Sequence, residues 1–199
     1  MSTNRPLRRI CVFTGSRRGA LPAYAEAANG LARDLFARGF GLVYGGGKVG
    51  LMNVIADAVL DLGGHVTGVI PDALVSKEVA HTGLSELRVV NSMHERKALM
   101  AELSDGFIAL PGGIGTMEEF FEVLSWAQLG IHNKPCGLLN AAGYYDPLIT
   151  FLDGAVAQDF VKPKHRALLI VESEPVALLD RFEKILAAPT GKRFDPSVT

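Results

Sequence analysis

Two ionisable residues stand in patterns that could support chemistry. Arg96 falls at a three-residue step inside the apolar stripe of a helix expected to begin after Ser92, and Glu119 follows a glycine-rich turn at 111–115. Breaking an N-glycosidic bond builds positive charge on the ribose, which an ionised carboxylate stabilises more than it stabilises the neutral ground state. A nearby arginine would keep that carboxylate ionised. The two residues are therefore candidates for cleaving such a bond.

Each of these residues also has a simpler interpretation. Arg96 could run its aliphatic stem along the apolar stripe or pair with a nearby acid. Thr116 is predicted to cap the helix that follows the turn, with Glu119 completing a capping box. Glu118 would then be an acid favoured by the dipole of the first helical turn. The sequence alone leaves both interpretations open.

The glycine-rich turns point to the class of ligand. Glycines let a ligand approach the backbone closely, and a helix start presents unpaired N–H groups and a partial positive charge that suit a phosphate. Single turns of this kind are often only structural, but three of them favour a phosphate-bearing ligand. They follow expected strands at 14–16, 45–47 and 112–116.

Two common nucleotide motifs do not fit. The dinucleotide fingerprint needs Gly-x-Gly-x-x-Gly after the first strand and an acid ending the second, whereas the chain offers Gly15 and Gly19 and ends the second strand at Tyr44. A Walker loop fails because Lys48 is followed by Val49 and lacks the required glycine spacing. The pattern favours a mononucleotide or a sugar phosphate.

The elements that would position these residues alternate along the chain. Short apolar runs separated by single helical patterns imply right-handed βαβ crossovers. We therefore predict an α/β fold, a doubly wound, Rossmann-like parallel sheet with helices on both faces, as one domain over 1–199 with an ordered core at about 9–188. The expected strands are 9–13, 41–44, 65–70, 87–90, 107–110, 136–139 and 168–171.

Composition limits the function classes. A net charge of −1 over 199 residues gives no support for general binding to nucleic acid or membrane surfaces. No apolar run approaches the roughly 18–20 residues that span a bilayer, and the first nine residues lack the apolar core of a signal peptide. Cys11 and Cys136 fall in expected strands as single buried thiols, and the five histidines show no metal-ligand spacing. We expect a cytoplasmic protein without a metal.

Three segments resemble one family in particular. Residues 111–119 read PGGIGTMEE, residues 44–52 read YGGGKVGLM and residues 93–97 read MHERK. These match the PGGxGTxxE, YGGGxxGLM and MHxRK motifs of the Lonely Guy family of cytokinin-activating phosphoribohydrolases, whose bacterial members were often labelled possible lysine decarboxylases. The resemblance also includes 126–132 and 137–145, and it extends from about residue 9 to residue 171.

The resemblance implies an activity and a set of residues. It implies hydrolysis of cytokinin riboside 5′-monophosphates, which are N6-substituted AMP, to free base and ribose 5-phosphate without a cofactor. Arg96 and Glu119 would be catalytic. A homodimer or larger oligomer would have its site near the subunit interface. The residues implied to bind substrate are Gly45, Gly46, Glu78, Lys97, Gly112, Gly113, Ile114, Gly115, Thr116, Met117, Glu118 and Ser125.

The chain departs from the family pattern at two places, and alternatives remain. Asn53 stands where the family usually has glycine, and Arg17 and Arg18 replace smaller polar residues. The alternatives are a general AMP or purine mononucleotide nucleosidase and a non-catalytic nucleotide or cofactor carrier. Glu119 could stabilise the charged ribose or orient water. A lysine decarboxylase has little support, because no lysine stands in a setting typical of a pyridoxal Schiff base.

Overall fold

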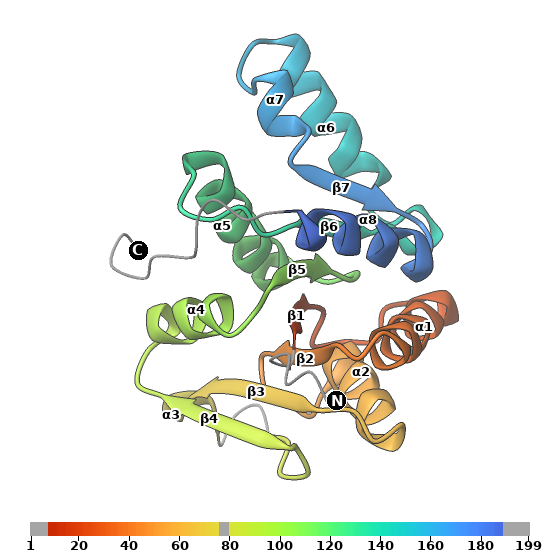
Figure 1. Ribbon diagram of the computed structural model, residues 1–199, viewed down its shortest axis with the longest axis vertical. Coiled ribbons are helices and arrows are strands. Elements are labelled where there is room, and N and C mark those ends of the chain that lie inside the picture. The colour runs from red at the N-terminus through yellow and green to blue at the C-terminus, as the bar shows by residue number, and fades with distance from the viewer. Residues whose placement is uncertain (1–7, 76–79, 189–199) are drawn as a thin grey trace.

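A single parallel sheet runs through the computed structural model, which describes residues 8–75 and 80–188 (Figure 1). Seven strands lie in the order β4-β3-β2-β1-β5-β6-β7. The predicted doubly wound fold is confirmed. The strands are β1 (Arg9–Phe13), β2 (Gly41–Tyr44), β3 (Val66–Pro71), β4 (Glu86–Val90), β5 (Gly106–Ala109), β6 (Cys136–Leu139) and β7 (Leu169–Glu172).

Helices cover both faces because alternate strand residues point to opposite sides. Ile10 and Val12 of β1 join the core beneath α1, α2 and α8, whereas Cys11 and Phe13 join the core beneath α4 and α5. Ala141–Gly143 forms a single 3₁₀ turn. The helices are α1 (Pro22–Ala37), α2 (Gly50–Asp61), α3 (Asp72–Val75), α4 (Met93–Glu102), α5 (Ile114–Leu129), α6 (Asp146–Ala157), α7 (Pro163–Arg166) and α8 (Pro175–Ala187).

The helix starts follow local chemistry, with one correction. Pro22 occupies the first turn of α1, and the Ser92 hydroxyl caps α4 by accepting a hydrogen bond from Glu95 N–H at 3.1 Å. The predicted cap at Thr116 is wrong. Helix α5 begins earlier, with Gly113 as its N-cap and no side-chain cap bond, so Thr116 lies buried inside the first turn.

The strand order fixes where a ligand can bind. The chain winds outward from β1 through β2, β3 and β4, and then returns to place β5 on the other side of β1. Between β1 and β5 the order reverses, and crevices form beyond the carboxyl ends of strands at such a switch point. All three predicted anion-binding turns follow strands there, after β1, β2 and β5.

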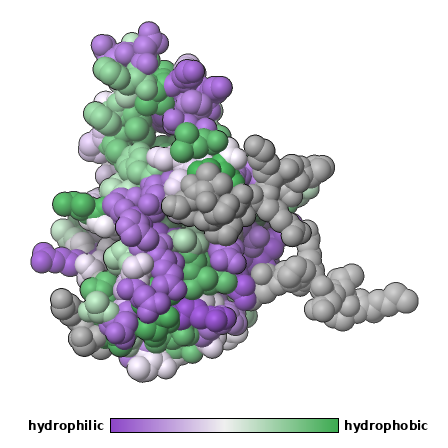
Figure 2. Space-filling view, turned by 90° about the vertical axis from the view of Figure 1, so that its left-hand side faces the viewer, coloured by the Kyte–Doolittle hydropathy of each residue, from purple (hydrophilic) through white to green (hydrophobic). Residues whose placement is uncertain are grey.

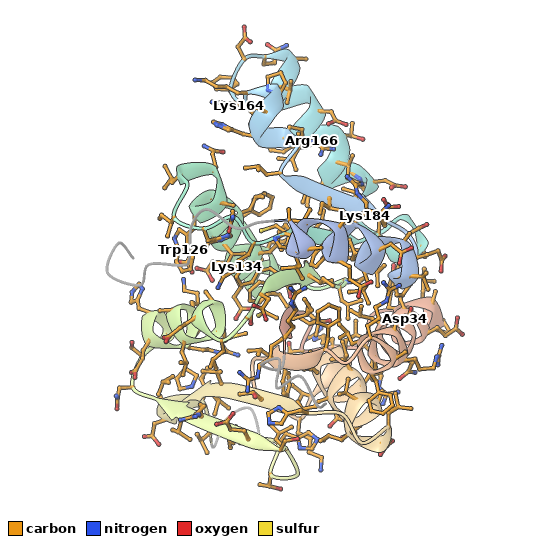
Figure 3. The ribbon with its side chains drawn as sticks, viewed as in Figure 1. Asp34, Trp126, Lys134, Lys164, Arg166 and Lys184 are labelled. Carbon is orange, nitrogen blue, oxygen red and sulfur yellow. The ribbon has the colours of Figure 1, made fainter. Side chains whose placement is uncertain are left out.

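Helices α6 and α7 project from the rest of the molecule (Figure 1), and Lys164 and Arg166 lie near the far end of the projection (Figure 3). Helix α6 contains no buried residue although its mean composition is apolar. Phe151 is 69% exposed and Phe160 is 87% exposed. In Figure 2, hydrophobic and hydrophilic residues lie side by side on this projection. Within the described residues, no helix has the length and apolar character needed to cross a membrane.

Candidate active site

A cavity of about 320 Å³ opens beyond the carboxyl ends of β1, β2 and β5. Its walls come from all three glycine turns and from helices α2, α3, α4 and α5. It brings together Arg96 and Glu119 with most of the glycine-turn residues predicted from sequence. The residues that line it are Val12, Phe13, Thr14, Gly15, Ser16, Gly45, Met52, Leu74, Met93, Arg96, Gly113, Ile114, Gly115, Thr116, Glu118 and Glu119.

Arg96 is a buried cation whose guanidinium is fixed by backbone carbonyls. Its Nε donates to the Val69 carbonyl at 3.1 Å and its Nη2 donates to the Gly45 carbonyl at 2.9 Å. Burying a charge is costly unless it is paired and hydrogen-bonded, and these bonds satisfy one edge of the group. The remaining nitrogen, Nη1, lies 3.7 Å from Glu119 Oε1.

Glu119 faces Arg96 from α5. Its side chain is only 14% exposed, and the 3.7 Å separation is within ion-pair range but longer than a hydrogen bond. Its charge also acts on Cys11 of β1, which lies in the core beneath α4 and α5. Burial raises the pKa of the Cys11 thiol well above its usual value, and the Glu119 carboxylate raises it further. The site therefore holds a partly buried cation and anion side by side.

The turns after β1 and β5 are bound to each other. Gly15 N–H donates to the Pro111 carbonyl at 3.1 Å, and the Thr14 hydroxyl donates to the same oxygen at 3.3 Å. Gly112 must be glycine, because a Cβ there would overlap the Thr116 hydroxyl and would lie 2.8 Å from Gly15 N. The turns after β1 and β5 thus form one continuous wall.

The start of α5 is open toward the cavity. A Cβ at Gly113 or Gly115 would meet nothing within 4 Å, so a ligand can approach both positions closely. Ile114 is 90% exposed. The first N–H groups of a helix have no partner inside it and carry a partial positive charge. This end of α5 is suited to a phosphate or another anion.

Lys97 and Ser125 lie outside this cavity. Lys97 Nζ bonds to Glu118 at 2.5 Å and to Glu122 at 2.9 Å. Burial alone would lower the pKa of Lys97, but the hydrogen bonds to these two carboxylates raise it overall. Lys97 borders a separate hollow of about 240 Å³ next to Trp126. The exposed Ser125 hydroxyl donates to the Phe121 carbonyl at 2.7 Å within α5.

The other predicted binding residues have different surroundings. Gly46 belongs to the second turn but does not line the cavity, and its carbonyl accepts a hydrogen bond from His81 N–H. Gly112 borders an adjoining hollow rather than the main cavity. Met117 is partly buried against the core beneath α5. Glu78 lies outside the described residues.

Sequence reasoning missed the apolar wall of the cavity, which Met52, Leu74 and Met93 form. Met52 belongs to the glycine-rich motif at 44–52 and Met93 to the motif at 93–97. Their place in these motifs could have indicated that they lie at the cavity. Leu74 gives no such signal, because it belongs to the short helix α3. Over 8–75 and 80–188, no group of three or more histidine, cysteine or acidic side chains is placed to hold a metal ion.

Comparison with known sequences identifies the family. A family model described as possible lysine decarboxylase matches residues 52–182. The probable cytokinin riboside 5′-monophosphate phosphoribohydrolase LOGL9 of Oryza sativa subsp. japonica is 54% identical over 89% of this chain and 78% of its own length. The cytokinin riboside 5′-monophosphate phosphoribohydrolase LOG5 of Arabidopsis thaliana is 50% identical over 88% of this chain and 77% of its own length.

Solved structures extend the likeness in fold. The molybdenum cofactor carrier protein of Chlamydomonas reinhardtii has a TM-score of 0.70 at 20% identity, covering 91% of this chain and 99% of that chain. The molybdenum cofactor binding protein of Rippkaea orientalis has a TM-score of 0.68 at 21% identity, covering 91% and 98%. At these identities the likeness concerns the fold alone. The family match and the identity of about half to the plant proteins show that this chain belongs to the Lonely Guy family.

Proposed function

We propose that the protein hydrolyses the N-glycosidic bond of cytokinin riboside 5′-monophosphates, releasing the N6-substituted adenine and ribose 5-phosphate. Relatives about half identical in sequence carry the name of this activity. The observation that carries the proposal is the buried Arg96–Glu119 pair, 3.7 Å apart, inside a cavity walled by three glycine turns.

The cavity supplies separate places for the three parts of such a substrate. The 5′-phosphate would lie against the first N–H groups of α5 and the turn at 14–16. The ribose would then lie between Arg96 and Glu119, and the base would contact the apolar wall. Binding energy from the phosphate would hold the reacting bond in place, which is how remote contacts accelerate a reaction.

The reaction breaks the bond between ribose C1′ and the base nitrogen. The electron pair leaves with the base, positive charge develops on the ribose, and the oxygen of a water molecule bonds to C1′. One proton of that water passes to the base nitrogen, and the other stays on the new C1′ hydroxyl. Glu119 would act on this charge directly or by orienting the water. Both roles need an ionised carboxylate, and Arg96 is placed to keep it so.

We further propose that the protein acts as a homodimer or larger oligomer in the cytoplasm, with the site near the interface. Helix α6 carries an apolar sequence, yet Leu148, Ile149 and Leu152 are only partly buried against the core, and Phe151 is 69% exposed. Large exposed apolar surfaces mark protein–protein contacts. Lys97, outside the cavity of one chain, would then contact substrate through the assembled interface.

A product assay tests the proposed activity. Purified protein would be incubated separately with N6-isopentenyladenosine monophosphate and with AMP, and free base would be followed by chromatography. We expect base release, faster from the N6-substituted nucleotide. Faster release from AMP would identify a general mononucleotide nucleosidase. Binding of both nucleotides without release from either would identify a carrier and overturn the proposal.

A further inference from the structure

Two successive carbonyl groups of the second glycine turn accept hydrogen bonds from residues elsewhere in the chain. The Gly45 carbonyl accepts a hydrogen bond from Arg96 Nη2 at 2.9 Å, and the next carbonyl, that of Gly46, accepts one from His81 N–H at 3.0 Å. Gly46 has a φ of +77°, which favours glycine. The conformation of this turn therefore connects the position of His81 to the position of the Arg96 guanidinium.

The His81 ring is itself fixed on both nitrogens. The residue is 4% exposed, and its Nδ1 accepts a hydrogen bond from Gly83 N–H at 3.1 Å. An acceptor at Nδ1 places the proton of the neutral ring on Nε2. That nitrogen lies 2.8 Å from Asp57 Oδ1, to which it donates. The ring has no remaining polar atom for another partner.

Asp57 belongs to α2, the helix that begins directly after the same glycine turn. Its second oxygen, Oδ2, accepts a hydrogen bond from Asn53 Nδ2 at 2.6 Å, one turn earlier in the helix. Both carboxylate oxygens are therefore engaged. The turn leads along the chain into α2, and Asp57 of α2 bonds to the His81 ring. The backbone N–H of His81 in turn bonds to the Gly46 carbonyl, so these contacts tie the turn to the helix that follows it.

We propose that His81, held by Asp57, is a positioning residue. It fixes the Gly45–Gly46 turn and thereby keeps the Arg96 guanidinium in its position beside Glu119. This role rests on the proposed function, in which Arg96 acts on the substrate. His81 does not line the cavity. It acts through one backbone bond to the turn, and the turn acts through one bond to the guanidinium. Misplacement of about 1 Å at a catalytic group can cost up to about a hundredfold in rate.

Two substitutions separate this role from simple packing. In His81→Gln the side-chain nitrogen reaches about as far as Nε2 and can still donate to Asp57. In His81→Asn the side chain can still accept from Gly83 N–H but stops short of Asp57. We expect kcat to fall about tenfold or more in His81→Asn and to stay within about threefold of wild type in His81→Gln. KM should change little in either variant, because the phosphate contacts of α5 are intact.

The hydrogen bond between Asp57 and His81 can also be removed by changing Asp57. The Asp57 side chain is 45% exposed, so Asp57→Ala leaves no closed cavity in the core. It should lower kcat as much as His81→Asn, and the double variant should lose no more than either single variant. His165→Asn, on the distant helix α7, is the matched control and should leave kcat unchanged.

Two outcomes in the kinetics would overturn the proposal. One is a wild-type kcat in His81→Asn, and the other is an equal loss in His81→Asn and His81→Gln that follows their melting temperatures. A readout independent of turnover comes from crystal structures of both variants. The Arg96 Nη2 bond to the Gly45 carbonyl should be lost in His81→Asn and kept in His81→Gln. If wild type releases no base, the proposed function fails, and these structures still decide whether His81 positions Arg96.

Discussion

Arg96 Nη1 lies 3.7 Å from Glu119 Oε1, while the other edge of the same guanidinium is bonded to backbone carbonyls. The arginine is thus held by strand and turn backbone rather than by the carboxylate it faces. A rigidly placed cation beside a mostly buried carboxylate is a preorganised arrangement, which needs little rearrangement when charge develops on a substrate.

Replacing Arg96 by lysine should show that the shape of this group matters as well as its charge. Lysine carries one ammonium and cannot bond to the carbonyls of Val69 and Gly45 while also facing Glu119. We expect Arg96→Lys to lower kcat by at least about tenfold, measured by base release. Arg88→Lys, at an exposed position on β4, is the control. Equal activity in the two variants would show that only the charge at position 96 is needed.

Two glycines in the site should respond differently to alanine. A Cβ at Gly45 would overlap Arg96 Nη2, so Gly45→Ala should displace the guanidinium and lower kcat. A Cβ at Gly115 meets nothing within 4 Å, and alanine in a helix is more stable than glycine by roughly 0.5–1 kcal/mol. Gly115→Ala should therefore raise the melting temperature but raise KM, because its methyl group enters the space proposed for the phosphate.

Steady-state kinetics and thermal unfolding of both variants check this contrast. An unchanged KM in Gly115→Ala would place the phosphate elsewhere. An unchanged kcat in Gly45→Ala would show that the guanidinium position is not critical.

His132 should make the protein less stable in mild acid. Burial lowers the pKa of His132 to about 4, with Lys134 adding to the lowering and the hydrogen bond to the Val123 carbonyl opposing it. The unfolded value is about 6.5. Because the unfolded state binds the proton more readily, this contribution to stability is present above about pH 6.5 and is lost as the pH falls toward 4. Between pH 7 and pH 5 the loss should be about 2 kcal/mol.

Urea unfolding at pH 7 and pH 5 measures this loss. His132→Gln keeps a donor for the Val123 carbonyl but does not titrate, so its stability should fall less than that of wild type over the same interval. Parallel losses in the two proteins would show that other groups cause the acid sensitivity.

The exposed apolar side of α6 should be the contact between subunits. Phe151→Glu would place a charge in the proposed interface, where burying it is costly. We expect this variant to sediment as a monomer and to lose turnover, since the site is proposed to lie near the interface. Phe36→Glu changes a phenylalanine that is 42% exposed on α1 and should leave the assembly intact. A monomeric wild type would contradict the proposed assembly.

The sheet could be predicted because each strand is a short apolar run bounded by glycine, proline or polar turn residues. Buried parallel strands need apolar side chains on both faces, and so the expected run at 136–139 is the strand β6 itself. Helix α2 ends at Asp61, and Gly63 just beyond it adopts a φ of +84°, a conformation that favours glycine after a helix. Local chemistry determines both features, and they are visible without tertiary information.

Features that depend on contacts between distant segments could not be predicted in the same way. Thr116 and Glu119 have capping-box spacing, but Gly113 begins the helix because Gly112 packs against the turn after β1. The hydrogen bonds from Lys97 to Glu118 and Glu122 join α4 to α5, and the spacing of residues within either helix does not predict them. The apolar stripe did place Arg96 toward the interior, whereas its carbonyl partners come from β3 and the turn after β2.

The most direct test of the account is the rate of base release by Glu119→Gln. Glutamine keeps the size of the side chain and removes its charge, and Glu102→Gln, at an exposed position on α4, is the matched control. With N6-isopentenyladenosine monophosphate under single-turnover conditions, we predict a loss of at least about a hundredfold in Glu119→Gln alone. The melting temperature and the affinity for ribose 5-phosphate should be retained. Near-normal release by Glu119→Gln would contradict the assignment of this carboxylate as the catalytic group.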